Sequence, residues 1–446
     1  MKLFSKILFF IFIVLAGIIY WQYPRLNIIS GFGAKNMCSC LFEANRDQAI
    51  ITTSDNNFSP IAIAKYKIDR ENLRVTASVF GMMKRTAVYH EDLGCQLILK
   101  GETEPVIDYF PVPHNCPEST AYPQGNEDQK DTILPNINYE KLEKAVSNAF
   151  DKEGVDSLKT RSVLVIHKDI IIAEKYASDF DKNSLILGWS MTKSVLATLF
   201  GILQKQGKTD LENMHLFQEW ENSERSSISL GDLLQMKSGL EWEENYDKIS
   251  DVTQMLFLDK DMTKKQLNKP LAYKIGEYFN YSSGTSNLLS GYLRNQFKTH
   301  QEYLDFPIKQ LYDKLGMSSM LIETDLSGNY VASSYGWANT RDWAKLGLLY
   351  LHKGNWFGEQ IIDESWVDYV STPNGVSNGI YGAHFWLNTG GYRPDVPRDM
   401  FAMEGYQGQM VFIIPSKNLV VVRMGLTEEP VIDFNKMLKD IIATIE

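Results

Sequence analysis

A short polar stretch at the head of a long apolar run is the feature that most constrains this chain. Residues 189–194 read Trp-Ser-Met-Thr-Lys-Ser, and residues 195–206 are apolar at helical spacing up to Gly207. The pattern predicts a buried helix whose first turn carries Ser190 and Lys193. Because these two residues are three positions apart, their side chains lie on one face of that helix.

A serine beside a buried lysine can act as a nucleophile with its own base. A serine hydroxyl attacks poorly until a neighbouring group accepts its proton. A lysine that is removed from water shifts toward the neutral amine, which can accept that proton. The alternative is structural, with Ser190 as a helix cap and Lys193 in solvent, since Ser-x-x-Lys by itself also occurs by chance.

The composition favours a globular protein and excludes several kinds of partner. The 446 residues are 44% hydrophobic, which is enough for a sizeable core. The net charge is −10 and no basic cluster occurs, so nucleic acid is not expected as a partner. The seven histidines show no metal-binding spacing, and nucleotide-binding fingerprints are missing, so neither a metal nor a cofactor is expected.

The first 24 residues have the pattern of a membrane anchor. The apolar run 7–19 follows Lys2 and Lys6 and precedes three aromatic residues. We expect an uncleaved anchor over residues 1–24, with the rest of the chain periplasmic or extracellular. A cleaved signal peptide is the alternative, because its apolar region has a similar length.

All four cysteines precede residue 120, at positions 38, 40, 95 and 116. In an exported chain, this count predicts two disulfides. Cys38 and Cys40 are too close in sequence to pair comfortably with each other. Each is therefore expected to pair with Cys95 or Cys116, and the sequence leaves both connectivities open.

Residues 25–135 are predicted to form a small β-leaning module that ends in a linker. Its β-prone runs lie at 73–79, 85–89 and 95–99. Residues 112–131 are rich in proline, asparagine, glycine and charge, which is typical of a linker. We find no catalytic constellation in this module.

Residues 136–446 are predicted to form the main domain. Helical spacing occurs at 139–150 and 287–294, and hairpins are indicated at 162–175 and 410–424. Ser229 and Asp232 have the form of a capping box at the start of a short helix. A turn-like segment before the helix at 287 contains Tyr281, a phenol that can exchange protons with a neighbouring lysine and serine.

Three ordered motifs now stand in the main domain: Ser190-x-x-Lys193, Tyr281-Ser282-Ser283 and Tyr406-Gln407-Gly408-Gln409. Together they resemble the serine β-lactamase-like superfamily. The chain is most similar to class C β-lactamase-related hydrolases, in the branch of the 6-aminohexanoate-dimer hydrolases and esterases. The resemblance covers about residues 136–440, and supporting stretches are Asp232-Leu233-Leu234, Ser238-Gly239-Leu240, Leu315-Gly316-Met317 and Arg341-Asp342-Trp343-Ala344.

The resemblance implies an α/β (α+β) fold. An antiparallel sheet flanked by helices would pack beside an all-helical lobe, with the active site in the cleft between them. The small β-leaning module would precede this domain.

The resemblance also implies a chemistry, that of an exported serine hydrolase cleaving an amide or ester bond of a small molecule through an acyl-Ser190 intermediate. Lys193 and Tyr281 would transfer the protons. The backbone N–H groups of Ser190 and Gln409 would form the oxyanion hole, and no cofactor would be needed.

Ser283, Tyr406, Gly408 and Tyr246 are the expected substrate contacts. Class C β-lactamases carry asparagine where this chain has Ser283, and Lys-Thr-Gly where it has Tyr406-Gln407-Gly408. Both changes remove groups that hold a penicillin, so β-lactam hydrolysis is not expected as the main activity.

Two rival functions remain open. A peptidoglycan-directed D,D-peptidase or D-aminopeptidase would use the same three catalytic residues and differ only in the cleft. A non-catalytic binding protein on the same fold is the other rival, and the presence of Ser190, Lys193 and Tyr281 together argues against it.

Overall fold

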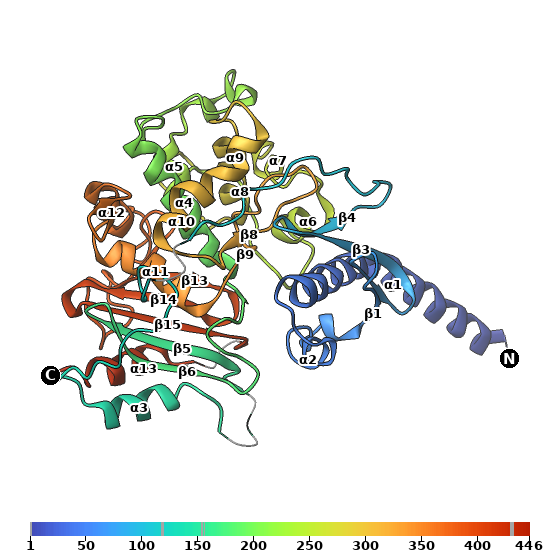
Figure 1. The fold of residues 1–446 in the computed structure, drawn as a ribbon. Coiled ribbons are helices and arrows are strands. Elements are labelled where there is room, and N and C mark those ends of the chain that lie inside the picture. Colours follow the sequence, from blue (N-terminus) through green and yellow to red (C-terminus); the bar gives the residue numbers. More distant parts are fainter. Residues whose placement is uncertain (1, 117–119, 153–154, 156, 429–431) are drawn as a thin grey trace. The chain divides into compact units, whose positions relative to one another are not determined.

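The computed structural model describes residues 2–116, 120–152, 155, 157–428 and 432–446 (Figure 1). The chain forms two compact units. Unit 1 contains Met1–Val106, Glu243–Met262 and Asp325–Ser327, and unit 2 contains Ile107–Trp242, Thr263–Thr324 and Gly328–Glu446. The segment from Ile107 onward therefore groups with unit 2, whereas the division between 25–135 and 136–446 stays a prediction.

Unit 1 combines a long helix with a four-stranded antiparallel sheet in the order β1-β2-β3-β4. Its strands are β1 (Ala64–Asp69), β2 (Arg74–Val79), β3 (Met82–His90) and β4 (Gly94–Ile98). Its helices are α1 (Lys2–Cys38), the π-helical turn η1 (Ser39–Glu43), α2 (Gln48–Thr53), the short 3-10 helix η2 (Ile61–Ile63) and α6 (Asp251–Leu258). The second half of α1 packs against β2 and β3, because alternate residues of these strands are apolar.

The prediction of an N-terminal membrane anchor is wrong. Across the residues that the structure describes, no helix is both long and apolar enough to cross a membrane. The apolar run 7–19 is shorter than the roughly 20 residues that a spanning helix needs. Helix α1 continues beyond this run through Pro24, and Ala34 and Met37 near its end are fully buried in unit 1. The predicted periplasmic or extracellular location depended on the anchor and is withdrawn with it.

One of the predicted cross-pairs is present as a disulfide. Cys38 at the end of α1 is bonded to Cys95 in β4, and their Cα atoms are 6.0 Å apart. Within the described part of the chain, Cys40 and Cys116 do not form the second predicted disulfide. Cys40 lies in unit 1 and Cys116 in unit 2.

Unit 2 is built on a six-stranded antiparallel sheet in the order β12-β13-β14-β15-β5-β6. The strands are β5 (Thr160–His167), β6 (Ile170–Tyr176), β12 (Trp386–Leu387), β13 (Phe401–Gly405), β14 (Gln409–Ile414) and β15 (Leu419–Gly425). Both predicted hairpins are therefore present, as β5–β6 and β14–β15. The two hairpins pair through β15 and β5. This pairing brings the strands that precede Ser190 and the strands near the C-terminus into one sheet.

Helices cover both faces of this sheet (Figure 1). On one face lie α3 (Tyr139–Ser147) and α13 (Phe434–Ile442), which share a core with Val163, Val165 and Val421. On the other face lies α11 (Thr340–Leu351), which packs against β5, β14 and β15. Because successive strand residues point to opposite faces, a strand of a sheet covered on both sides is buried at every position, as in β15.

A helical lobe occupies the chain between the first and third motifs. Its helices are α4 (Thr192–Lys205), α5 (Leu230–Leu234), α7 (Lys264–Leu267), α8 (Ser283–Arg294), α9 (His300–Pro307), α10 (Asp313–Leu315) and α12 (Glu364–Ser371). Short strands complete the unit: β7 (Ile186–Leu187), β8 (Leu321–Ile322), β9 (Gly336–Ala338), β10 (Asn355–Trp356) and β11 (Glu359–Gln360). The capping box of Ser229 and Asp232 is present at the start of α5. The predicted fold class, an antiparallel sheet flanked by helices with a helical lobe, is confirmed.

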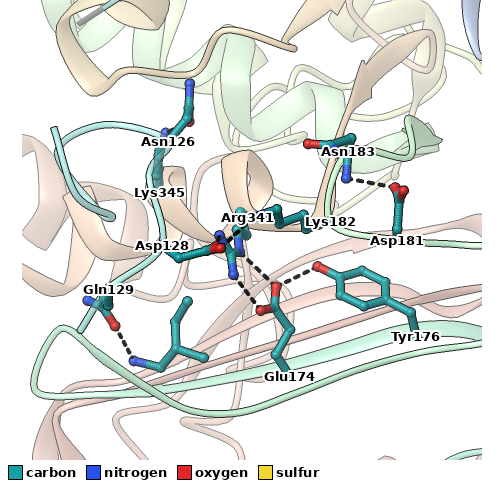
Figure 2. A network of polar contacts seen from close by, with 11 residues as sticks. Asn126, Asp128, Gln129, Glu174, Tyr176, Asp181, Lys182, Asn183, Arg341 and Lys345 are labelled. Atoms are coloured by element: carbon teal, nitrogen blue, oxygen red, sulfur yellow. Dashed lines mark hydrogen bonds and ion pairs between the residues drawn. The ribbon is translucent and has the colours of Figure 1, made fainter. Parts of the chain in front are cut away.

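The described residues of the segment expected to be a linker belong to unit 2. Tyr122 is only 2% exposed, and its hydroxyl donates a hydrogen bond to the carbonyl oxygen of Arg341 at 3.2 Å. Figure 2 shows the polar network that follows. The Arg341 guanidinium binds Asp128 at 2.6 Å and holds both carboxylate oxygens of Glu174 at 2.8 and 2.6 Å. A bidentate pair of this kind fixes orientation as well as position.

Candidate active site

A strained turn presents Ser190. The 3-10 helix η3 (Trp189–Met191) joins β7 to α4, and Trp189 has φ +48°, a left-handed conformation that non-glycine residues rarely adopt. The Thr192 hydroxyl donates to the Trp189 carbonyl at 2.6 Å and accepts the Gly336 N–H at 2.9 Å. The Gly188 N–H donates to the Gly336 carbonyl at 2.8 Å. These bonds hold the turn in its strained conformation.

Two glycines allow the backbone to approach this turn. A Cβ atom on Gly405, at the end of β13, would lie 2.1 Å from the Gly188 carbonyl oxygen. A Cβ atom on Gly188 would lie 2.2 Å from the ring of Trp343 in α11. Any side chain at either position would displace backbone or a buried ring. The end of β13 therefore passes directly beside the turn that carries Ser190.

Lys193 joins the first motif to the second. Its side chain is 1% exposed, and its ammonium nitrogen Nζ donates to Ser190 Oγ at 3.0 Å, to Ser283 Oγ at 3.1 Å and to the Ser333 carbonyl at 2.8 Å. Removal from water disfavours the charged form of a lysine relative to its amine. Lys193 is thus positioned to take the Ser190 proton.

Tyr281 contacts the same lysine. Its ring centroid is 4.9 Å from Lys193 Nζ, which is the distance of a cation–π contact. The ring also packs against Trp386 and Tyr381, at centroid distances of 5.4 and 5.9 Å. Helix α8 begins two residues later and is capped by Ser282, whose hydroxyl accepts the Thr285 N–H at 2.9 Å.

The third motif forms the tight connection between β13 and β14. Gln407 and Gly408 both have left-handed backbones, with φ +61° and +75°. The Gln409 amide donates to the Tyr406 carbonyl at 3.1 Å and accepts the Gly425 N–H at 2.9 Å. The Tyr406 ring is 44% exposed and contacts the Trp189 ring edge-on at a centroid distance of 5.7 Å. The motif therefore lies next to the Ser190 turn.

Arg423, in strand β15, forms hydrogen bonds with the backbone of the β13–β14 connection. Its guanidinium is fully buried and donates to the carbonyl oxygens of Gln407 and Gly408 at 3.1 and 2.9 Å. Burial lowers the pKa of Arg423 to about 9. A Cβ atom on Gly408 would lie 2.7 Å from this guanidinium, so the position requires glycine for packing as well as for its φ.

Most of the predicted site residues come together in unit 2. Hydrogen bonds join Lys193 to Ser190 and Ser283, a cation–π contact joins it to Tyr281, and Tyr406 adjoins Ser190 through the ring of Trp189. Tyr246 belongs to unit 1, where its side chain is 48% exposed. Its role as a substrate contact stays a prediction.

Sequence reasoning missed three residues around the lysine. Ser333 supplies a carbonyl acceptor for Lys193, and its own N–H donates to Asn287 Oδ1 at 3.1 Å. Trp386 packs on Tyr281. These contacts link positions 46, 105 and 140 residues apart, and no local pattern indicates them.

Sequence reasoning also missed His384, which forms hydrogen bonds with the helices around the site. Its Nδ1 donates to the Leu234 carbonyl at 2.8 Å, and its Nε2 accepts the Ser286 hydroxyl at 3.0 Å. The Ser194 hydroxyl donates to the His384 carbonyl at 2.6 Å. Burial lowers the pKa of the His384 imidazole to about 3, so the ring stays neutral. It joins α4, the end of α5 and α8, the elements that carry the first two motifs.

A serine and a buried lysine at the head of a helix, beside an antiparallel sheet, match the resemblance to the serine β-lactamase-like superfamily. A sequence model of the beta-lactamase family matches residues 149–436, and the chain belongs to this family. The resemblance drawn from the three motifs is confirmed.

Individual relatives agree with this assignment. The 6-aminohexanoate-dimer hydrolase of Paenarthrobacter ureafaciens is 23% identical over 345 residues, which are 72% of this chain and 82% of the relative. Among solved structures, a family VIII carboxylesterase has a TM-score of 0.55 at 15% identity, covering 71% of this chain and 98% of its own. A penicillin-binding protein homologue from Caulobacter crescentus has a TM-score of 0.55 at 14% identity, covering 71% and 99%. At these identities the solved structures support the fold alone.

Proposed function

We propose that the protein is a serine hydrolase of the class C β-lactamase-related type, which cleaves an amide or ester bond through an acyl group on Ser190. The observation that carries the proposal is the 3.0 Å contact between Ser190 Oγ and Nζ of the buried Lys193. The strained turn at Trp189 keeps the hydroxyl at the head of α4. A base within hydrogen-bond reach is the geometric requirement for an activated serine.

The reaction would proceed in two acyl-transfer steps. Ser190 Oγ attacks the carbonyl carbon while its proton passes to the neutral amine of Lys193. Tyr281, against the same lysine, gives its phenol proton to the leaving amine or alcohol and takes up the proton held by Lys193. Water then attacks the acyl-enzyme with the same pair as base, which releases the acid and restores Ser190.

The oxyanion formed at each step needs donors on the backbone. The N–H groups of Ser190 and Gln409 are the candidates, because β14 begins at Gln409 and the strand paired with it ends against Gly188. In other acyl-transfer enzymes one such donor contributes about 3–4 kcal/mol to the transition state.

The third motif supports a small amide or ester, rather than a β-lactam, as substrate. Its residues Tyr406, Gln407 and Gly408 offer a phenol, an amide and a glycine, and none carries a cation that could bind a β-lactam carboxylate. Ser283 occupies the position where class C β-lactamases carry asparagine, and its hydroxyl accepts a hydrogen bond from Lys193. The names of the relatives, a 6-aminohexanoate-dimer hydrolase and a carboxylesterase, fit such a substrate class.

The test is the intact mass of the purified protein after exposure to a fluorophosphonate, together with its rate of p-nitrophenyl acetate hydrolysis. We expect one adduct on Ser190 and its loss in Ser190→Ala, with hydrolysis falling by roughly 10³-fold or more. Ser227→Ala, an exposed serine outside the site, is the control and should behave as the wild type. An adduct or hydrolysis that survives in Ser190→Ala would contradict the proposal.

Exposure to a penicillin separates this proposal from the peptidase alternative. We expect no stable penicilloyl adduct, because the third motif lacks the cation. A stable adduct on Ser190 would instead favour a D,D-peptidase.

A further inference from the structure

We propose that His114, Cys116 and Asp313 form a binding site for a zinc ion in unit 2. One ligand atom from each residue lies within 4.8 Å of the other two. His114 and Cys116 belong to the extended segment that enters unit 2, and Asp313 is the first residue of α10 (Figure 1). None of the three belongs to the proposed catalytic set, so the inference goes beyond the hydrolase function.

The distances fit a tetrahedral ion. His114 Nδ1 lies 3.3 Å from Asp313 Oδ1, and Cys116 Sγ lies 3.7 Å from the same oxygen. Zinc binds nitrogen and oxygen at about 2.0–2.1 Å and sulfur at about 2.3 Å. A tetrahedron with these bond lengths has edges of about 3.3 Å between nitrogen and oxygen and about 3.6 Å between sulfur and oxygen. The two observed separations are close to these edges.

The second nitrogen of His114 supports the same assignment. Its Nε2 lies 3.0 Å from the Met320 carbonyl oxygen, which can only accept, so Nε2 carries a proton. Its Nδ1 faces the Asp313 carboxylate oxygen, and a bound ion would lie between these two atoms and Cys116 Sγ. A carbonyl that holds the outer N–H is also the usual arrangement for a metal-bound histidine.

The donor set selects the kind of ion. Imidazole, thiolate and one carboxylate suit zinc, whereas magnesium and calcium prefer oxygen ligands throughout. All three side chains are half-buried, which leaves an entry path for the ion. The bound ion would fasten the extended segment to α10, in addition to the hydrogen bond from the Asn115 N–H to Asp313 Oδ1 at 3.1 Å.

Metal titration of the full-length protein tests this inference. The protein would be purified without a polyhistidine tag, treated with a chelator and titrated with Co²⁺, followed by displacement with Zn²⁺. We expect one Co²⁺ per chain, with the absorption band of a thiolate–cobalt bond, and full displacement by Zn²⁺. Saturating Zn²⁺ should also raise the unfolding temperature, because the ion binds the folded state.

Three substitutions and one control identify the ligands. Cys116→Ser should abolish the thiolate band. His114→Gln and Asp313→Asn should each weaken binding by at least about 100-fold, since even outer partners of metal ligands are worth about 10–100-fold. The amide oxygen of Asp313→Asn can still accept the Asn115 N–H, so this variant should fold. Cys40→Ser, a thiol of unit 1, is the matched control and should retain the band.

Two results would overturn the site. One is failure of the wild-type protein to bind Co²⁺ or Zn²⁺ at one equivalent. The other is a thiolate band that survives in Cys116→Ser and disappears in Cys40→Ser.

Discussion

At the scale of single residues, Lys193 organises the site. A lysine ammonium has three N–H donors, and here they reach Ser190, Ser283 and the Ser333 carbonyl. In the proposed mechanism the neutral amine would keep two donors and turn its lone pair toward Ser190. The other two partners would then hold the nitrogen in place during proton transfer.

Ser283→Ala tests this positioning role. Removal of the acceptor should lower kcat/KM for the p-nitrophenyl ester by about 10–100-fold, since a hydrogen bond to a charged group is worth about 1.5–3 kcal/mol. Ser290→Ala is the control on the same helix, since its hydroxyl bonds the Tyr330 carbonyl instead. Equal values of kcat/KM for Ser283→Ala and Ser290→Ala would contradict the positioning role of Ser283.

Gly405→Ala tests the close contact between the end of β13 and the turn that carries Ser190. The new Cβ would meet the Gly188 carbonyl at 2.1 Å, so one backbone segment must move. We expect at least a tenfold loss of kcat with the fold retained, because a misplaced nucleophile reacts slowly. Circular dichroism and ester hydrolysis measure the two quantities. Gly17→Ala has no atom within 4 Å of the new Cβ and should leave the rate unchanged.

At the scale of elements, His384 is the joint between three helices. It bonds Leu234 at the end of α5, Ser286 in α8 and Ser194 in α4. The Ser190–Lys193 turn opens α4, and Ser283 opens α8. The relative position of these two helices sets the distance between Lys193 and Ser283, and the buried imidazole helps to hold it.

The buried, neutral imidazole of His384 predicts that the free energy of unfolding decreases in acid. The folded pKa of about 3 lies below the ordinary value of 6.5, so below pH 6.5 the unfolded chain takes up a proton that the folded chain does not. Stability should fall as the pH drops from 6.5 toward 3, by about 1.4 kcal/mol per pH unit, or roughly 3 kcal/mol at pH 4.5.

Urea unfolding of His384→Gln at pH 7 and pH 4.5 measures this contribution. The difference in unfolding free energy between the two pH values should shrink by roughly 2–3 kcal/mol relative to the wild type. His215→Gln replaces an exposed histidine and should keep the wild-type difference. An unchanged difference in His384→Gln would show that other groups cause the acid sensitivity.

At the scale of the whole molecule, the segment from Ile107 acts as part of unit 2. Its Tyr122 is buried among Arg341 and Lys345, each with its charged group 5.7 Å from the ring centroid. Asp128 then binds Arg341 (Figure 2). A segment with these contacts stabilises the hydrolase unit, although its composition is that of a linker.

Tyr122→Ala measures this stabilisation. Loss of a buried aromatic ring should cost unit 2 about 3–5 kcal/mol. Tyr122→Phe should cost only about 1 kcal/mol, for the hydrogen bond to Arg341. The loss of ester hydrolysis during a urea titration follows the unfolding of unit 2, which contains Ser190 and Lys193. Tyr273→Ala, at an exposed tyrosine, is the control. Equal midpoints for the wild type and Tyr122→Ala would contradict the packing role.

Local signals explain how much of the fold was predicted. The Ser190 helix, the two hairpins of the large sheet and the capping box at Ser229 depend on residues within a few positions of one another, and all are present. The membrane anchor was also read from a local signal and was wrong. The apolar run continues into a helix whose second half is buried by the sheet of unit 1, a contact with residues far along the chain.

The sequence by itself determined the family, the order of the three motifs and the side chains that make a serine hydrolase chemically possible. Only the tertiary structure decided which groups meet: Ser333 with Lys193, Trp386 with Tyr281, and Asp313 with His114. The physical reason is that helix and strand periodicity is encoded by neighbouring residues. A site, in contrast, consists of contacts between segments separated by roughly a hundred residues or more, and such contacts form only when the sheet and the helical lobe pack.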